Sequence, residues 1–442
     1  FLSIDFKKAI NSPVEPNLLM QCKHTSISRP VWVDNHHIIL LQKVGARGQL
    51  VRYSVKDNTS TVISAANNGN ITYFDYSASQ QLIAVLRTQS DNRVYIELLK
   101  PNGELLSSNP IQYLHDMSKY RKIFPSFVPN KNYLVFSSGR QLYSLNFEGE
   151  INKIGSPMEQ RIRRPNFHTN GKQMLVIKGH YDSSIARMAV SDDIESQPLT
   201  DAVQSVASER GAIFQPNGRL IAYESSRTGE DQIWLADGNK TEQLSQFPLD
   251  NFIFGFRWAD DGKSLLVNSD HTLTQIFLDK TYNPAPVDFP VQFLFHWQSN
   301  NNTALANVRV NGITKFAEID LTSGKVNIIS EQPARWAAKL TSGEILYMDA
   351  RYQFWQEGTI EYQQIHALEG YGSNQRFVIE DNTLYGVSAD NELWAFSLND
   401  KTLMMLTSLP ENIKHINDIN GTQILISTVE SSRKSVVEMV LE

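Results

Sequence analysis

The sequence predicts an all-β protein built from repeated four-stranded antiparallel units, and three observations support this. Residues 212–247 hold four short apolar runs, separated by turns that contain Pro-Asn-Gly, Thr-Gly-Glu and Asp-Gly-Asn. Runs this short are typical of strands, and Asn-Gly and Asp-Gly are strong hairpin signals. Similar units recur along the chain at intervals of 39 to 51 residues. These units lack the 3.6-residue apolar period that would indicate helical repeats.

Each unit places an apolar residue before a polar turn, and a second apolar run follows the turn. Repeats of this length that contain only strands and turns are typical of β-propeller blades. We therefore predict one β-propeller domain over residues 1–442 with about ten blades. An eight-bladed ring and two smaller propellers are the alternatives. The ten aligned apolar positions are Trp32, Tyr76, Phe127, Phe167, Phe214, Trp258, Trp297, Leu340, Ile379 and Ile419.

The two ends of the chain predict how the ring closes. The last unit, residues 413–442, is one strand short, while Leu18–Cys22 has no neighbouring strand in the sequence. Because an open sheet edge promotes aggregation, we expect the N-terminal strand 18–22 to complete blade 413–442. The segment Ile111–Lys122 lengthens one repeat and predicts a long loop or a short helix on the rim. Long loops on rigid scaffolds often carry recognition sites, although a simple connector is the alternative.

Composition excludes several classes of protein. A net charge of −6 argues against a nucleic-acid-binding surface, which needs an excess of basic residues. No apolar run approaches the roughly 18 residues that a membrane-spanning helix requires. Cys22 is the single cysteine, so the chain cannot form an intrachain disulfide, and we expect it to be a small buried apolar residue. The opening residues Phe1–Ile4 fit the remnant of a signal or membrane segment.

Residues 214–234, FQPNGRLIAYESSRTGEDQIW, resemble the TolB-type WD40-like propeller repeat. The resemblance is weaker at residues 258–267 and 127–145, and after residue 334 only the spacing persists. Proteins with this repeat include TolB, the propellers of prolyl-oligopeptidase-like peptidases, oligogalacturonate lyases, and the periplasmic halves of membrane-tethered winged-helix regulators similar to CadC and ToxR. The extra domains of TolB and of the peptidases have no counterpart in this sequence. The sensor half of such a regulator is therefore the resemblance that we favour.

This resemblance implies a non-catalytic sensor propeller of a transmembrane transcriptional regulator, located in the bacterial periplasm and tethered to the inner membrane before Phe1. A TolB-like scaffold for envelope proteins and a polysaccharide lyase are the alternatives. The sequence has no Gly-x-Ser-x-Gly, HExxH or Walker-type motif. We expect no catalysis, no cofactor and no direct contact with nucleic acid. We expect the partner to be a protein or a small anionic ligand at the mouth of the channel.

The candidate binding residues are basic residues that close the second strand of several units. In a propeller these turns emerge on one face around the channel mouth, where several cations would attract an anion. The alternative is that each residue serves its own blade. These residues are Arg87, Arg140, Lys178, Arg227, Arg309 and Arg351.

Three histidines are the metal candidates of the lyase alternative. His168, His296 and His415 lie on or beside predicted inner strands, and imidazole is a common metal ligand. The competing interpretation, which we favour, is that these side chains line the channel or are hydrogen-bonded without a metal.

Overall fold

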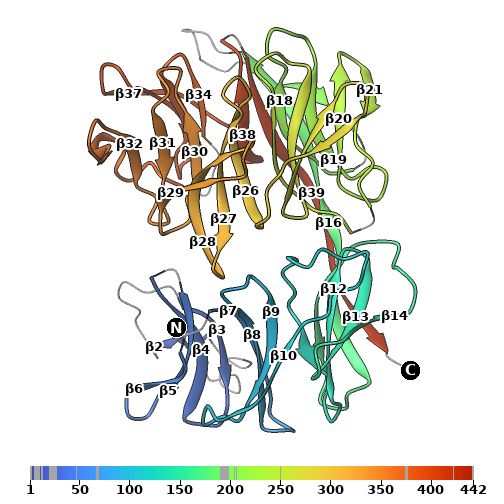
Figure 1. Ribbon diagram of the computed structural model, residues 1–442. Coiled ribbons are helices and arrows are strands. Elements are labelled where there is room, and N and C mark those ends of the chain that lie inside the picture. The colour runs from blue at the N-terminus through green and yellow to red at the C-terminus, as the bar shows by residue number, and fades with distance from the viewer. Residues whose placement is uncertain are drawn as a thin grey trace.

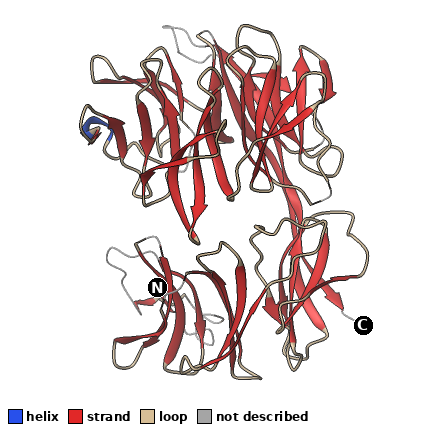
Figure 2. Ribbon diagram, in the orientation of Figure 1, coloured by secondary structure: helices blue, strands red, loops and turns tan. Residues whose placement is uncertain are grey.

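The computed structural model describes residues 2–3, 10, 13–18, 27–45, 47–65, 69–189, 199–203, 205, 207–248, 250–373, 377–421 and 423–440. Within these ranges the chain is strand and turn apart from one 3-10 turn, η1 (His366–Leu368). Eight sheets have four antiparallel strands each, and a ninth has five (Figure 2). The predicted all-β propeller architecture is therefore confirmed. No helix in the described ranges is long and apolar enough to cross a membrane.

The blades divide into two lobes, one above the other in Figure 1. The first lobe begins with three blades, each an antiparallel meander in chain order. Their strands are β3 (Ile27–Trp32), β4 (His37–Val44), β5 (Arg47–Ser54) and β6 (Thr59–Ser64); β7 (Asn70–Ser77), β8 (Leu82–Thr88), β9 (Val94–Leu99) and β10 (Leu105–Pro110); and β11 (Ser126–Phe127), β12 (Tyr133–Ser138), β13 (Gln141–Asn146) and β14 (Ile151–Ile154).

Two long strands, β16 (Gln173–Ala189) and β39 (Gln423–Val440), run antiparallel from one lobe into the other. In the first lobe β15 (Ile162–Phe167) pairs with the beginning of β16, and the end of β39 lies on its other side. In the second lobe β38 (Ile413–Ile419) pairs with the beginning of β39, while β17 (Thr200–Val203) pairs with the end of β16. Each long strand is thus the second strand of one blade and the third strand of another.

The second lobe adds five complete blades to this shared one. Their strands are β18 (Glu209–Phe214), β19 (Ile221–Ser225), β20 (Gln232–Asp237) and β21 (Lys240–Gln243); β22 (Ile253–Trp258), β23 (Ser264–Ser269), β24 (Thr272–Phe277) and β25 (Tyr282–Pro284); β26 (Val291–Gln298), β27 (Thr303–Val310), β28 (Ile313–Asp320) and β29 (Val326–Ser330); β30 (Trp336–Lys339), β31 (Ile345–Met348), β32 (Phe354–Glu357) and β33 (Tyr362–Gln364); and β34 (Val378–Glu380), β35 (Thr383–Val387), β36 (Glu392–Ser397) and β37 (Thr402–Ser408).

Apolar contacts between neighbouring sheets close the second lobe into a six-bladed ring. Strands such as β23 and β27 are buried on both faces, as blades that stack on two neighbours require. A buried cluster joins each blade to the next, including the shared blade to both of its neighbours. Members of each cluster from the two adjoining blades, in ring order, are Ile185 and Ala212, Ile213 and Phe256, Leu266 and Val291, Phe316 and Tyr347, Phe354 and Phe377, and Val387 and Ile426.

The ten aligned positions lie at or next to the end of the innermost strand of ten blades, so the predicted repeat is present throughout. The ten blades divide between the lobes, four in the first and six in the second, because β16 and β39 cross between them. Buried clusters link the four blades of the first lobe in a row. The prediction that the N-terminal strand completes the last blade is wrong. That blade, formed by β38 and the beginning of β39, is completed by β16 and β17. Leu18 instead pairs with Leu2, in the short sheet formed by β1 (Leu2–Ser3) and β2 (Asn17–Leu18). Residues 19–22, including Cys22, lie outside the described residues.

The crossing between the lobes is held by polar contacts between the two long strands. Asp182 forms an ion pair with Arg433 at 2.7 Å and accepts a hydrogen bond from Ser431. Gly179 has a φ of +110°, and a Cβ at this position would lie 1.9 Å from the carbonyl oxygen of Arg433. A side chain at residue 179 would therefore force the two strands apart where they pass between the lobes.

We predict that Gly179→Ala lowers the free energy of unfolding by about 3 kcal/mol or more, because it adds a backbone clash to an unfavourable φ. Gly155→Ala is the matched control, since Gly155 also has a positive φ but has no atom within 4 Å of a Cβ. Equilibrium urea denaturation measures both. Equal losses in the two variants would contradict tight pairing at the crossing.

Candidate ligand-binding channel

A cavity of about 260 Å³ lies on the axis of the second lobe. Residues on or beside the innermost strands of all six blades line it, as the central channel of a propeller requires. The lining residues are Gly211, Ile213, Glu224, Ile253, Gly255, Phe256, Arg257, Phe293, Phe295, Arg335, Trp336, Phe377, His415 and Asn417. Five of these are Phe or Trp, and Glu224, Arg257, Arg335, His415 and Asn417 add charged and polar groups, so the wall is mixed.

The aromatic wall is held rigidly by neighbouring rings. Phe293 and Phe295 have centroids 5.0 Å apart, and Trp336 lies edge-on to Phe377 at 5.8 Å. The indole nitrogen of Trp336 donates to the carbonyl oxygen of Phe377 at 2.7 Å. Because the indole hydrogen bond is satisfied within the protein, these rings offer a flat apolar surface to a ligand.

Several polar groups lie between these rings. Arg257 donates to the backbone carbonyls of Phe295 and Phe256, at 2.5 and 2.7 Å, so its guanidinium is fixed across two blades. Arg335 lies over the ring of Tyr352, 4.7 Å from its centroid. The amide nitrogen of Asn417 donates to Ser427 at 2.8 Å, whereas its buried Oδ1 has no partner. Buried acceptors are normally paired, so Oδ1 of Asn417 has an unused capacity to accept a hydrogen bond.

Glu224 connects the channel to the first lobe through a chain of ion pairs. Arg210 donates from Nε to Glu224 at 2.8 Å and from Nη2 to Asp231 at 2.9 Å. Asp231 in turn pairs with Arg161 of the first lobe at 2.9 Å. Burial raises the pKa of Glu224. The carboxylate of Glu224 in turn raises the pKa of Arg210. A ligand that changed the charge or position of Glu224 would therefore act on a contact between the lobes.

Asp418 fastens two inner strands of the ring together. Its carboxylate accepts a hydrogen bond from the backbone nitrogen of Phe214 at 2.7 Å, across the boundary between two blades. The equivalent contact in the first lobe joins Asp75 to the backbone nitrogen of Phe127 at 2.9 Å. Both aspartates directly precede an aligned apolar position, so this is a repeated device. Burial raises the pKa of Asp418 to about 7.

The two lobes are also joined by a set of opposite charges, which we call the interlobe clasp: Arg121, Arg140 and Arg161 of the first lobe, and Glu230, Asp231, Asp250 and Asp270 of the second. Arg121 pairs with Asp270 at 2.7 Å, and Arg140 pairs with Glu230 at 3.2 Å. Tyr143 donates to Asp250 at 3.0 Å. Burial raises the pKa of Asp250 and Asp270. The segment 111–122, expected to be a long loop or a short helix on the rim, supplies Arg121 and thus contacts the other lobe.

The six predicted basic residues do not surround one channel, because they are divided between the lobes. Arg87 and Arg140 lie in the first lobe, and Lys178 lies in the part of β16 that pairs with β15. Arg227, Arg309 and Arg351 lie in the second lobe. The sequence could not show this division, since it gives no sign that β16 and β39 cross between the lobes.

Three of these six residues form ion pairs within the protein. Arg87 is buried and pairs with Glu97 at 2.9 Å, and Arg140 belongs to the interlobe clasp. Arg227 pairs with Glu209 at 3.0 Å and lies over the ring of Trp234. Arg351 is exposed on the loop before β32. Arg309 differs from the others because it is buried and incompletely paired.

The three candidate histidines are also spread over both lobes. His168 is exposed at the turn between β15 and β16, where its Nδ1 accepts from the backbone of Asn170. His296 lies in β26, where burial lowers its pKa to about 4. Only His415 lines the channel. The three therefore cannot share one ion, and no group of three or more His, Cys, Asp or Glu side chains in the described part of the chain could hold a metal.

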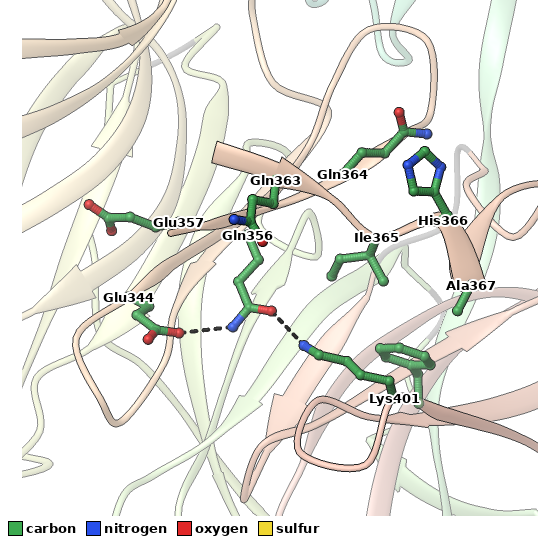
Figure 3. Close-up of a pocket in the computed structure, with 10 residues that line it drawn as sticks. Glu344, Gln356, Glu357, Gln363, Gln364, Ile365, His366, Ala367 and Lys401 are labelled. Carbon is green, nitrogen blue, oxygen red and sulfur yellow. Dashed lines mark hydrogen bonds between the residues drawn. The ribbon is translucent and has the colours of Figure 1, made fainter. Parts of the chain in front are cut away.

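A second hollow, of about 400 Å³, lies at the outer edge of the blades β30–β33 and β34–β37 (Figure 3). Its side chains bind one another: Gln356 donates to Glu344 at 2.8 Å and accepts from Lys401 at 2.9 Å. Glu357 accepts from the backbone nitrogen of Ile345. Because these polar groups are already paired, this groove is a weaker candidate than the channel.

No family model matches the sequence, and no curated protein matches it. Among solved structures, the chain of a nidogen/laminin complex is 8% identical with a TM-score of 0.40, covering 56% of this chain and 99% of that chain. The GH74 enzyme of Niastella koreensis is 11% identical with a TM-score of 0.35, and the match covers 94% of this chain and 69% of that chain. The tricorn protease is 13% identical with a TM-score of 0.26, and the match covers 86% of this chain and 44% of that chain. The description of the fold therefore depends on the strand pairing and not on these similarities.

We predict that Asp418→Asn removes a pH-dependent part of the stability. Because the folded protein holds the Asp418 proton up to about pH 7, while the unfolded chain releases it near pH 4, ionisation lowers the stability of the wild type as pH rises between these values. The variant should match the wild type at pH 4 and exceed it at pH 8 by up to about 4 kcal/mol. Urea denaturation across this pH range measures the difference. The same gain in Asp400→Asn, at an exposed turn, would contradict this explanation.

We further predict that Arg121 and Asp270 are coupled by about 2 kcal/mol or more, since both lie in the interface between the lobes. A double-mutant cycle with Arg121→Met and Asp270→Asn, followed by calorimetric unfolding, measures the coupling energy. The exposed pair Lys153 and Asp116, at 2.5 Å, is the control and should give less than about 1 kcal/mol. Equal coupling energies for the two pairs would show that the Arg121–Asp270 pair contributes no more to stability than an exposed surface ion pair does.

Proposed function

We propose that this chain is a non-catalytic binding propeller, and that its ligand binds in the channel of the second lobe. The observation that supports this most directly is the composition of the channel: aromatic rings held in place by neighbouring rings, several fixed polar and charged groups, and an unpaired acceptor on Asn417. Pockets that bind small molecules commonly combine aromatic side chains with oriented polar groups. The chemistry favours a ligand with a flat ring and polar substituents, one of which is a hydrogen-bond donor.

We propose further that binding is sensed through the contact between the lobes. Glu224 lines the channel, and Arg210 and Asp231 connect it to Arg161 of the first lobe. A ligand that moves Glu224 or neutralises it would weaken or strengthen this connection. Such a device suits the sensor half of a periplasmic, membrane-tethered transcriptional regulator, the role that the TolB-type resemblance implies. The proposed partner of the propeller is then the signalling part of that regulator.

The test is a thermal-shift screen of small aromatic compounds with polar substituents, followed by titration calorimetry of the compounds that stabilise the protein. Asn417→Leu and Phe293→Ala are expected to weaken binding at least tenfold, because each removes a contact in the channel. Met404→Ala, on an exposed strand of the second lobe, is the control and should bind as the wild type does.

Three results would count against the proposal. Unchanged affinity in both channel variants would place the ligand elsewhere. Conversion of a bound compound to a product would favour the lyase alternative. Capture of an envelope lipoprotein with the same affinity in the wild type and the channel variants would favour the TolB-like scaffold.

A further inference from the structure

A small recess lies between the lobes, separate from the channel. First-lobe residues form most of its lining, including Thr88 and the loop residues Tyr113, Tyr120 and Lys122. Arg309, near the end of β27, is the second-lobe residue in this lining. The β27–β28 hairpin also contacts the first lobe directly, because the backbone nitrogen of Gly312 donates to Asn92 at 2.8 Å. The recess is therefore part of the interface between the lobes.

Arg309 is a buried cation with incomplete hydrogen bonding. Its residue is 3% exposed, Nη2 donates to Gln292 at 3.2 Å, and Nη1 has no partner. In the described part of the chain Arg309 forms no ion pair with a carboxylate. A buried charge without a counter-charge costs several kcal/mol of stability. An arginine in this state beside a recess indicates that a negative group normally occupies the space.

The other charged groups around Arg309 add to this positive charge. Lys122 lines the same recess, and burial together with repulsion by Arg309 and Lys43 lowers its pKa to about 8. The nearby His271 is neutral, because burial lowers its pKa to about 3. Tyr113 and Tyr120 are the titratable groups that would stabilise the charge of Arg309 if their phenols were ionised. Burial raises the pKa of Tyr113, so its phenol stays neutral and supplies no counter-charge. Arg121 also lines the recess, but Asp270 balances its charge at 2.7 Å, so Arg309 and Lys122 are the cations of the recess that have no carboxylate partner in the described residues.

We propose that the recess between the lobes binds a small anion, coordinated by Arg309 of the second lobe and Lys122 of the first. The enclosed space is about 30 Å³, close to the volume of one water molecule, so it suits a chloride ion or the head of a carboxylate. Because the two cations come from different lobes, the bound anion links them. The guanidinium supplies directed donors, and the ammonium supplies a second charge.

The experiment is a thermal-shift and calorimetric titration of the whole chain with sodium chloride, sodium formate and, as a larger anion, sodium citrate. Ionic strength is held constant with sodium isethionate, which has no carboxylate and a bulkier sulfonate head. We expect chloride or formate to raise the melting temperature with saturation and citrate to have a weaker effect. The response should be lost in Arg309→Met and reduced at least tenfold in affinity in Lys122→Met. Lys131→Met, which removes an exposed lysine elsewhere in the first lobe, should respond as the wild type does.

Arg309→Met has a second expected result that a merely structural arginine would not give. Without a bound anion the variant should be at least as stable as the wild type, because it lacks the uncompensated buried charge. With saturating anion the wild type should be the more stable of the two. A wild type that does not respond to any of the anions would overturn the proposal, as would an unchanged response in Arg309→Met. Neither result would affect binding in the channel, which Asn417→Leu tests.

Discussion

The antiparallel pairing of β16 with β39 is the contact on which the rest of the molecule depends. Seventeen residue pairs, from Gln173 with Val440 to Ala189 with Gln423, form one ladder through both lobes. The two strands exchange roles at the crossing, so the same hydrogen bonds complete a blade in each lobe. Neither blade can lose its strands without damage to the other. Folding of the second ring therefore requires residues separated by more than 200 positions to meet, which makes assembly slow and cooperative.

This shared ladder also explains where the charges of the protein are placed. Since the lobes are joined by only two continuous strands, their relative position must be fixed by contacts at the interface. The interlobe clasp supplies these contacts with arginines on the first lobe and carboxylates on the second. Charge pairs of this kind are directional, and they respond to protonation and to neighbouring charges more strongly than apolar contacts do.

The channel and the interlobe recess therefore both adjoin residues that hold the lobes together. Glu224 reaches the clasp through Arg210 and Asp231, and Arg309 extends from the second lobe to the edge of the recess. A ligand in the channel would act on the clasp from within the six-bladed ring, and an anion in the recess would act on it from the interface. Both events would change how firmly the lobes are held, which is a suitable signal for a sensor.

The sequence by itself determined the repeat, since local turn chemistry and short apolar runs specify a blade without reference to its neighbours. All ten positions from Trp32 to Ile419 correspond to a blade, and the segment 111–122 was recognised as an insertion that lengthens one repeat. Only the tertiary structure decided how the blades close. The continuous strands 173–189 and 423–440 look like ordinary apolar runs, and pairing partners so far apart leave no local signal. For the same reason Arg227 and Arg309 looked equivalent in the sequence, although one is paired within its blade and the other is buried without a counter-charge.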